Sequence, residues 1–263
     1  MLPESLPIFQ VDAFTENLFG GNPAAVCPLK HWLPDETMQK IASENNLSET
    51  AFLVPMDGGF HIRWFTPKLE VDLCGHATLA SAYVIFNELN YPSNSIEFQS
   101  KSGLLQVRQE QQRIILDFPS DSPEPCTPPN GLLDALGIDA VEVLKGTTDY
   151  LVVLPQETDI RAAAPNFARL SQVEARGIII SAPGDQADFV SRFFAPASGI
   201  DEDPVTGSAH CTLTPYWSHR LNKSTLQARQ LSHRQGVLQC TMKNDRVLLS
   251  GQAVLYMKGN ITV

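Results

Sequence analysis

Two short segments of this chain carry the residue types that could perform acid–base chemistry at the start of a helix. One runs Asp203-Pro204-Val205-Thr206-Gly207-Ser208-Ala209-His210 after two further acids, and the other is Cys74-Gly75-His76-Ala77-Thr78. Glycine lets the backbone come close to a ligand, and the first amides of a helix present free N–H groups that attract anions. Taken alone, an N-capped helix with acids near its first turn explains the later segment equally well.

The side chains in and near these segments that could move a proton are Glu49, His76, Asp203 and Ser208. A carboxylate in a dry cleft can have its pKa raised, so that it accepts and donates protons near neutral pH. The ordinary pKa of histidine suits His76 to share or relay that proton. Each residue also has a structural interpretation: Glu49 as a charge at an element end, His76 as a capping partner, Ser208 as an N-cap and Asp203 as a turn residue before proline.

Composition excludes several classes of partner. The 263 residues have a formal net charge of -10, and the chain's pI is about 5.0, which argues against nucleic acid and against anionic membrane surfaces. No apolar run of 18 residues or more occurs, and the first residues lack the pattern of a signal peptide. The five cysteines are scattered and odd in number, so neither a disulfide framework nor a Cys-x-x-Cys metal site is expected. These features predict a cytoplasmic protein.

Alternating and helical patterns predict a chain of strands interrupted by a few helices. Strands are expected at 8–14, 24–27, 51–54, 60–65, 103–107, 113–118, 150–154, 177–180, 189–196, 237–240, 246–249 and 254–256. Helices are expected from 34 to 46, 77 to 86, 132 to 136 and 165 to 170, and after Ser208. The segment 77–86 has no polar face, which is typical of a buried helix. Residues 119–129, rich in proline, serine and acids, are expected to link two halves.

The two halves of the chain repeat each other. Arg63-Trp64-Phe65-Thr66-Pro67 matches Arg192-Phe193-Phe194-Ala195-Pro196 with an offset of 129 residues, and Gly75-His76-Ala77 matches Gly207-Ser208-Ala209 with an offset of 132. Gly103-Leu104-Leu105-Gln106-Val107 matches Gly236-Val237-Leu238-Gln239-Cys240, and Arg113-Ile114-Ile115-Leu116 matches Arg246-Val247-Leu248-Leu249, both with an offset of 133. The duplication predicts two pseudo-symmetric domains, at 1–118 and 119–263, with a last strand near 254–263 that could pack back on the first.

Each predicted domain wraps sheets around one apolar helix, so the fold class is α/β or α+β, and the family resemblance described below implies that each sheet is barrel-like. The starts of the two helices are expected to meet at the cleft between the domains, where Glu49, His76, Asp203 and Ser208 would converge around a carboxylate-bearing ligand. Other kinds of site have little support. The sequence lacks a Gly-x-Ser-x-Gly elbow, a Walker motif and Gly-x-Gly-x-x-Gly, and Cys74-Gly75-His76 has no second ligand pair for zinc.

With these motifs together, the chain resembles the PhzF family of phenazine-biosynthesis-like isomerases, which is related to diaminopimelate epimerase and proline racemase. The resemblance runs nearly end to end. It rests on the segments Asp12-Ala13-Phe14-Thr15, Gly21-Asn22-Pro23-Ala24-Ala25-Val26, Ser48-Glu49-Thr50-Ala51-Phe52, Arg63-Trp64-Phe65-Thr66-Pro67, Cys74-Gly75-His76-Ala77-Thr78 and Asp203-Pro204-Val205-Thr206-Gly207-Ser208-Ala209.

The resemblance implies a pair of similar domains with the site between them, and an isomerase in which Glu49 moves a proton on a small carboxylate substrate. It implies that His76, Asp203 and Ser208 assist Glu49, and that Gly75, Gly207 and Asn22 bind substrate. No metal or organic cofactor is expected, and members are commonly homodimers.

Two alternatives stay open from the sequence. Epimerases and racemases of this fold place a thiol at each helix start, and here Cys74 stands at one start while the matching place in the second half is taken to be Val205. One thiol is then missing, which favours an isomerase with a single carboxylate over an epimerase. A non-catalytic binding module would share the fold and the anion pocket, and only proton exchange on a bound ligand would separate it from an enzyme.

Overall fold

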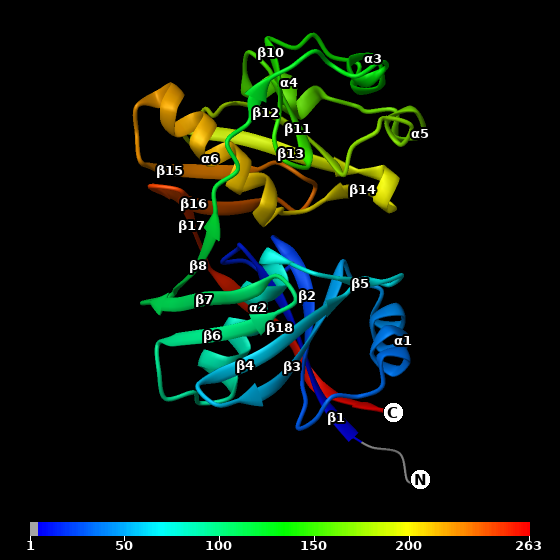
Figure 1. Cartoon of the computed structure of the whole chain (residues 1–263), viewed down its shortest axis with the longest axis vertical. Helices are drawn as coiled ribbons and strands as arrows, with labels where there is room; N and C mark the ends of the chain where they lie inside the picture. Colours follow the sequence, from blue (N-terminus) through cyan, green and yellow to red (C-terminus); the bar gives the residue numbers. More distant parts are fainter. Residues whose placement is uncertain (1–4) are drawn as a thin grey trace. The chain divides into compact units, whose positions relative to one another are not determined.

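The structure is a computed structural model that describes residues 5–263 and is mostly β-strand with a few helices (Figure 1). It divides into two compact units. The first comprises the chain up to Asp117 together with Ser250–Val263, and the second comprises Phe118–Leu249. The last 14 residues therefore group with the first unit. The sequence predicted 119–263 as the second domain, with a last strand near 254–263 that could pack back on the first.

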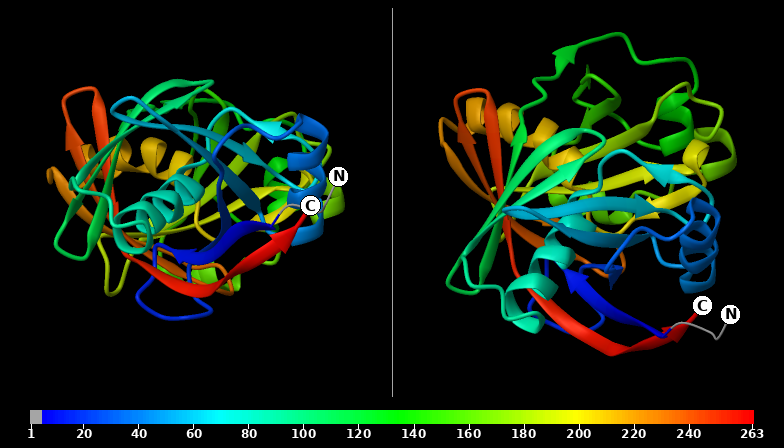
Figure 2. Two further views of the ribbon diagram at one scale, coloured as in Figure 1. Left: turned by 90° about the horizontal axis from the view of Figure 1, so that it is seen from below. Right: turned by 60° about the horizontal axis from the view of Figure 1, so that its bottom comes forward.

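The first unit is a sheet of parallel and antiparallel strands. Its strands are β1 (Ser5–Ala13), β2 (Asn22–Pro28), β3 (Glu49–Met56), β4 (Gly59–Phe65), β5 (Glu70–Val71), β6 (Ser95–Ser100), β7 (Gly103–Glu110), β8 (Arg113–Pro119) and β18 (Ala253–Thr262). β1 lies between β18 and β2, antiparallel to both, and Figure 2 shows the blue β1 beside the red β18. β2 and β3 run parallel, as do β4 and β6, while β3–β4, β4–β5, β6–β7 and β7–β8 are antiparallel pairs.

The two faces of this sheet carry different helices because successive side chains of a strand point to opposite faces. Helix α1 (Asp35–Asn45) covers one face, where Met38 and Ile41 pack in a cluster with Ala25, Phe52 and other apolar side chains. Helix α2 (Gly75–Glu88) packs against β1, β2 and β3. Along β3, the side chains of Thr50 and Phe52 point to the face of the sheet that α1 covers. The Glu49 side chain points to the opposite face, which α2 covers.

Helix α2 confirms the expectation of a buried helix. Every residue from His76 to Ala82 is buried, as are Val84 and Ile85. Small residues such as Ala77, Ala80 and Ala82 let strands such as β1, β2 and β18 pack against the helix. A helix start that is buried in this way orients its first residues rigidly.

The second unit repeats the same order of elements. Its strands are β9 (Glu124–Pro125), β10 (Glu142–Lys145), β11 (Asp149–Val153), β12 (Gly177–Pro183), β13 (Phe189–Ala195), β14 (Ile200–Asp203), β15 (Thr225–Gln230), β16 (Gly236–Lys243) and β17 (Arg246–Gly251). Its helices are α3 (Leu132–Leu136), α4 (Glu157–Ala162), α5 (Phe167–Leu170) and α6 (Gly207–Leu221). β11 and β12 run parallel, as do β13 and β15, while β10–β11, β12–β13, β13–β14 and β15–β16 are antiparallel.

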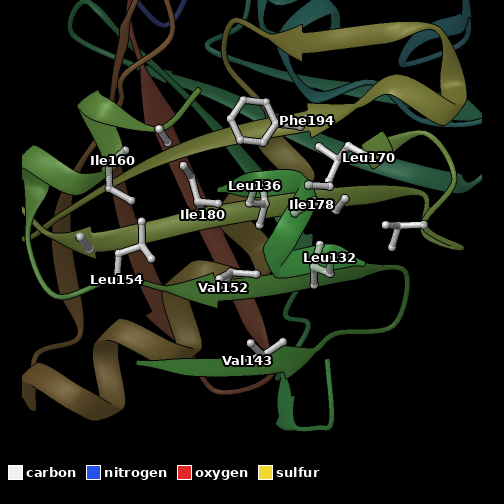
Figure 3. Packing of buried hydrophobic residues seen from close by; sticks show 14 of the residues in the cluster. Leu132, Leu136, Val143, Val152, Leu154, Ile160, Leu170, Ile178, Ile180 and Phe194 are labelled. Carbon is white, nitrogen blue, oxygen red and sulfur yellow. The ribbon is translucent and has the colours of Figure 1, made fainter. Parts of the chain in front are cut away.

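An apolar cluster holds α3, α4 and α5 on one face of this sheet. Figure 3 shows Leu132 and Leu136 from α3 packed with Val152, Ile178 and other strand residues. The opposite face carries α6, whose Trp217 donates its indole N–H to the Ser181 hydroxyl of β12 at 2.9 Å. The second unit thus places one helix on the face that α2 takes in the first unit.

A partly buried ion pair in each unit marks the duplication in three dimensions. Arg63 of β4 binds the Glu70 carboxylate with two hydrogen bonds, of 2.7 and 2.8 Å, and Arg192 of β13 binds Glu202 in the same way, at 2.7 and 3.0 Å. Each guanidinium lies over the ring of the phenylalanine two residues later, at 5.2 Å for Arg63 and 5.0 Å for Arg192. The matching sequence segments therefore make matching contacts.

Several elements differ from the sequence-based expectation. The strands β5, β6, β10, β14 and β15 and the helix α4 are not among the predicted elements, and each is only two to six residues long. The segment 119–129, expected to be a linker, contains the short strand β9, which pairs with Leu144 and Lys145 of β10. Within the described residues, no helix combines the length and apolar character that a membrane crossing requires.

Candidate active site

Glu49 and His76 face each other in the first unit. Glu49 is the first residue of β3, and His76 is the second residue of α2. The Glu49 Oε2 and His76 Nε2 atoms are 3.2 Å apart, with only 12% of the Glu49 side chain and 5% of the His76 side chain exposed. The direction between them departs from that of a strong hydrogen bond, so the contact is chiefly electrostatic.

The other ring nitrogen of His76 has two neighbours. The Asn22 amide nitrogen lies 3.1 Å from Nδ1, and the Cys74 sulfur lies 3.5 Å from the same atom. Asn22 is the first residue of β2 and is completely buried. The two ring nitrogens of His76 therefore have neighbours from β2, from β3 and from the N-cap of α2.

Burial keeps His76 neutral. Removal from water lowers the pKa of His76 from 6.5 to about 3, because a charged imidazolium loses more hydration than the neutral ring. The expectation that His76 accepts and relays a proton by charging near neutral pH therefore does not fit its surroundings. In this structure His76 is a neutral group beside the Glu49 carboxyl.

The start of α2 is an uncapped helix N-terminus. Its N-cap residue, Cys74, makes no side-chain capping bond, and its first turn contains no acid. The first amides of a helix then present a partial positive charge to whatever lies in front of them. The buried start of α2 therefore has two kinds of group. The Glu49 carboxylate is a negative group, and the backbone amides of Gly75 and His76 can bind an anion.

In the second unit, Asp203 is tied to the start of α6 through Thr206. The Thr206 hydroxyl donates to Asp203 Oδ2 at 2.6 Å, and the Gln230 amide donates to the Asp203 carbonyl at 2.8 Å and to the Thr206 hydroxyl at 3.1 Å. The Thr206 backbone N–H donates to Gln230 Oε1 at 2.9 Å. Both Asp203 and Gln230 are buried, so this network fixes the chain where it enters the helix.

Ser208 is bound to Arg176, which the sequence analysis did not identify. The Arg176 guanidinium donates to Ser208 Oγ at 3.1 Å and forms an ion pair with Asp149. Asp149 is only 1% exposed, and burial raises the pKa of its carboxyl, which the Arg176 guanidinium opposes. The N-cap of α6 is Thr206, so the interpretation of Ser208 as an N-cap is wrong. No sequence signal pointed to Arg176, because it lies 32 residues from its partner.

The structure corrects one assignment. The residue equivalent to Cys74 is Thr206 and not Val205, because Cys74 and Thr206 are the N-caps of α2 and α6, with similar extended backbone angles. The sequence comparison slipped by one residue, although its offset of 132 between Gly75 and Gly207 already gives Thr206. The conclusion that only one helix start carries a thiol is unaffected.

Glu49, Cys74 and His76 each offer a donor atom that could bind a metal ion, and these atoms lie within 4.8 Å of one another. Both ring nitrogens of His76 already have protein neighbours, since Nε2 lies 3.2 Å from Glu49 and Nδ1 lies 3.1 Å from the Asn22 amide and 3.5 Å from the Cys74 sulfur.

The predicted site residues thus fall into two groups. Asn22, Glu49, Gly75 and His76 come together in the first unit, and Asp203, Gly207 and Ser208 lie at the start of α6 in the second. The convergence of the two groups at one cleft stays a prediction. The polar partners that sequence reasoning missed are Arg176, Thr206 and Gln230, whose roles depend on contacts between distant segments.

The duplicated mixed α+β fold of this chain is also found in an epimerase. A hydroxyproline epimerase from Agrobacterium vitis has this fold, with a TM-score of 0.64, 7% identity and coverage of 98% of this chain and 93% of that protein. The chain belongs to the phenazine biosynthesis-like family (PhzC-PhzF), whose sequence profile matches residues 11–259.

Within this family, two relatives are similar over almost their whole length. An uncharacterized isomerase from Pseudomonas aeruginosa is 55% identical over 256 residues, which cover 97% of this chain and 98% of the relative. The crystal structure of a PhzF-family phenazine biosynthesis protein from Enterococcus faecalis has a TM-score of 0.96 and 46% identity, with coverage of 99% of this chain and 100% of that protein. The resemblance noted from the motifs is thereby confirmed, as is the fold class.

Proposed function

We propose that this protein is an isomerase that moves a proton from one carbon to another of a small carboxylate, with Glu49 as the acid–base group and without a cofactor. The observation that carries the proposal is the pairing of Glu49 with His76 at the uncapped start of α2. Relatives named as isomerases support the reaction class.

The first step of the proposed reaction is removal of a proton. The Glu49 carboxylate takes a proton from an acidic C–H of a cyclic or unsaturated carboxylate, and the electron pair of that bond becomes an enolate-like system. The partial positive charge at the α2 start favours this negative charge. Neutral His76, with Nε2 3.2 Å from Glu49 Oε2, places a polar ring beside the base without adding a charge.

The second step returns a proton to the substrate. Glu49, now a carboxylic acid whose O–H proton exchanges in part with solvent, gives its proton to a different carbon of the conjugated system, and the double bond moves accordingly. No atom or electron is gained or lost, so the reaction needs no redox partner. A positioned acid–base group contributes about a hundredfold to ten-thousandfold in rate, and orientation of the substrate adds to this.

The second unit has a supporting role in the proposal. We assign Asp203, Ser208 and the Gly207 amide to the same substrate, with Ser208 oriented by Arg176 and Asp203 by Thr206. The uncapped start of α6 would bind a second anionic group of the substrate. The class of substrate is thus a small molecule with at least one carboxylate.

Exchange of carbon-bound hydrogen with solvent tests this proposal. The protein is incubated in D2O with a panel of cyclic and unsaturated carboxylic acids, and deuterium uptake is followed by proton NMR and mass spectrometry. At least one acid should take up deuterium. Glu49→Gln, which keeps the shape but removes the base, should lower the rate by about a hundredfold to ten-thousandfold.

The control is Glu44→Gln, the same change at an exposed position of α1, which should leave the exchange rate unchanged. Uptake that survives Glu49→Gln would overturn the assignment of the base. If no acid exchanges although carboxylates bind, the protein is a binding module of this fold and the proposed function is wrong.

A further inference from the structure

We infer that Asn22 is a positioning residue that fixes which nitrogen of His76 carries the proton, so that His76 always presents an N–H to the Glu49 carboxylate. This inference rests on the proposed function in one respect only, the importance of Glu49 for proton transfer. It differs from the expectation that Asn22 binds substrate.

The strand register brings the three residues together. β2 and β3 run parallel, with Ala24 opposite Glu49, and Asn22 lies two residues before Ala24 on the same face. That face carries α2, whose first turn supplies His76. The imidazole is therefore held between Asn22 on one side and Glu49 on the other, with its ring nitrogens 3.1 and 3.2 Å from their respective neighbours.

The chemistry of the amide decides the proton position. The Asn22 Nδ2 group can only donate, so Nδ1 of His76 must accept and cannot carry a proton. The Cys74 thiol, 3.5 Å from Nδ1, is a weak donor that favours the same arrangement. In a neutral ring the proton then resides on Nε2, which faces Glu49 Oε2.

The opposite orientation of the amide is less consistent with the surrounding groups. If Asn22 Oδ1 faced Nδ1, the ring proton would have to sit there, and the Nε2 lone pair would face the Glu49 carboxylate at 3.2 Å. Two electron-rich atoms at that distance repel in a buried place. The network therefore has one favourable arrangement while Glu49 is ionised, and Asn22 is the group that selects it.

The arrangement has a functional consequence. A histidine that could exchange tautomers would accept a proton from Glu49 as readily as it donates to it, and the proton taken from substrate could be lost to the imidazole. With Nδ1 occupied by a donor, His76 cannot compete for that proton. The proton stays on Glu49 and is available for return to the same molecule.

Asn22→Asp tests the inference with a nearly isosteric change. A carboxylate beside Nδ1 accepts rather than donates, so it should draw the ring proton to Nδ1 or charge the ring. The titratable groups among the described residues that face His76 are Glu49 from β3 and Cys74 from the α2 start. The readout is the nitrogen NMR spectrum of histidine-labelled protein, assigned to His76 with a His76→Gln variant.

The wild-type protein should show His76 protonated at Nε2 only, and Asn22→Asp should show a proton at Nδ1. Deuterium exchange should fall by about a hundredfold in Asn22→Asp, the size of effect that misplacing a catalytic group produces. Asn94→Asp, the same change at an exposed loop position of the first unit, should alter neither measurement.

Two results would overturn the inference: a proton on Nδ1 in the wild-type protein, or an unchanged His76 spectrum in Asn22→Asp. A variant that fails to fold is recognised by circular dichroism, and the wild-type spectrum then decides the question alone. The NMR measurement needs no turnover, so failure of the proposed function is recognised separately, by the Glu49→Gln exchange experiment.

Discussion

Glu49 and Gly177 occupy equivalent places in the two units. Glu49 begins β3 opposite Ala24 of β2, and Gly177 begins β12 opposite Asp149 of β11, in parallel strand pairs of the same register. The next residues confirm the match, since Thr50 pairs with Phe65 and Ile178 with Phe194, the two phenylalanines of the repeated motif. The duplication has therefore kept a carboxylate at this place in one half only.

The surroundings of Gly177 explain why no side chain stands there. A Cβ atom at Gly177 would lie 2.2 Å from the Phe193 ring and 2.9 Å from Asp149 Oδ1. Phe193 is buried, so its ring has little room to move. The second half has instead Arg176, one residue earlier, in contact with Asp149 and Ser208. The two duplicated units thus have different functional groups near equivalent positions.

Gly177→Ala should destabilise the protein by about 1–3 kcal/mol, the usual cost of overpacking a filled site. Urea unfolding measures the change. Glu49→Ala is the matched comparison, because a Cβ is already accommodated at that equivalent place, and it should cost less. Equal losses in the two variants would mean that the Phe193 ring moves aside freely.

Cys74→Ser should change deuterium exchange little, because the proposed base is Glu49 and the serine hydroxyl still offers a donor to His76 Nδ1. The equivalent N-cap in the second half is Thr206. A mechanism that needs one thiol at each helix start therefore lacks its second thiol. Loss of exchange in Cys74→Ser together with retained exchange in Glu49→Gln would establish a thiol-based epimerase instead.

Arg176→Ala should destabilise the second unit and weaken the orientation of Ser208. It leaves the buried Asp149 carboxyl without its ion-pair partner, which costs about 2 kcal/mol after allowance for the partial exposure of the arginine. Asp149→Asn combined with Arg176→Ala should recover part of that stability. A double-mutant cycle by urea unfolding measures the coupling, and full additivity would show that the pair contributes nothing.

Acid should destabilise the protein partly through His210. Burial lowers the pKa of His210 from 6.5 to about 4, and its Nδ1–H donates to the Thr206 carbonyl at 2.8 Å. Between these pH values the unfolded chain binds a proton that the folded chain does not, so stability falls as the pH falls below 6.5.

The His210 contribution has a slope of up to about 1.4 kcal/mol per pH unit. His210→Gln should flatten the pH dependence of the unfolding free energy by about that amount, whereas His61→Gln, at an exposed position of β4, should not. An unchanged slope in His210→Gln would show that folding does not shift the pKa of His210.

Sulfate and small carboxylates should stabilise the protein through the uncapped starts of α2 and α6. An anion that binds only the folded state adds about 2.7 kcal/mol at a concentration of a hundred times its dissociation constant. Thermal unfolding in sulfate, compared with chloride at equal ionic strength, measures this. The absence of any difference would count against the anion-binding role of Gly75-His76 and Gly207-Ser208.

The sequence by itself determined the duplication, the buried character of α2 and a strand directly after Glu49, whereas the structure begins that strand at Glu49 itself. These features depend on local pattern: the repeated Arg-aromatic-Phe and Gly-x-Ala segments, a helix without a polar face, and alternation along short strands. The family motifs named the residues at which chemistry was expected.

Only the tertiary structure decided which of those residues meet, and in what protonation state. The contact of Asn22 with His76 joins residues 54 positions apart, and that of Arg176 with Ser208 joins residues 32 apart, so no local pattern contains either. The neutrality of His76 follows from complete burial, a property of the packed fold that lowers its pKa to about 3. The residue types set the possible chemistry, and packing determined which polar groups lie beside one another and that His76 is neutral.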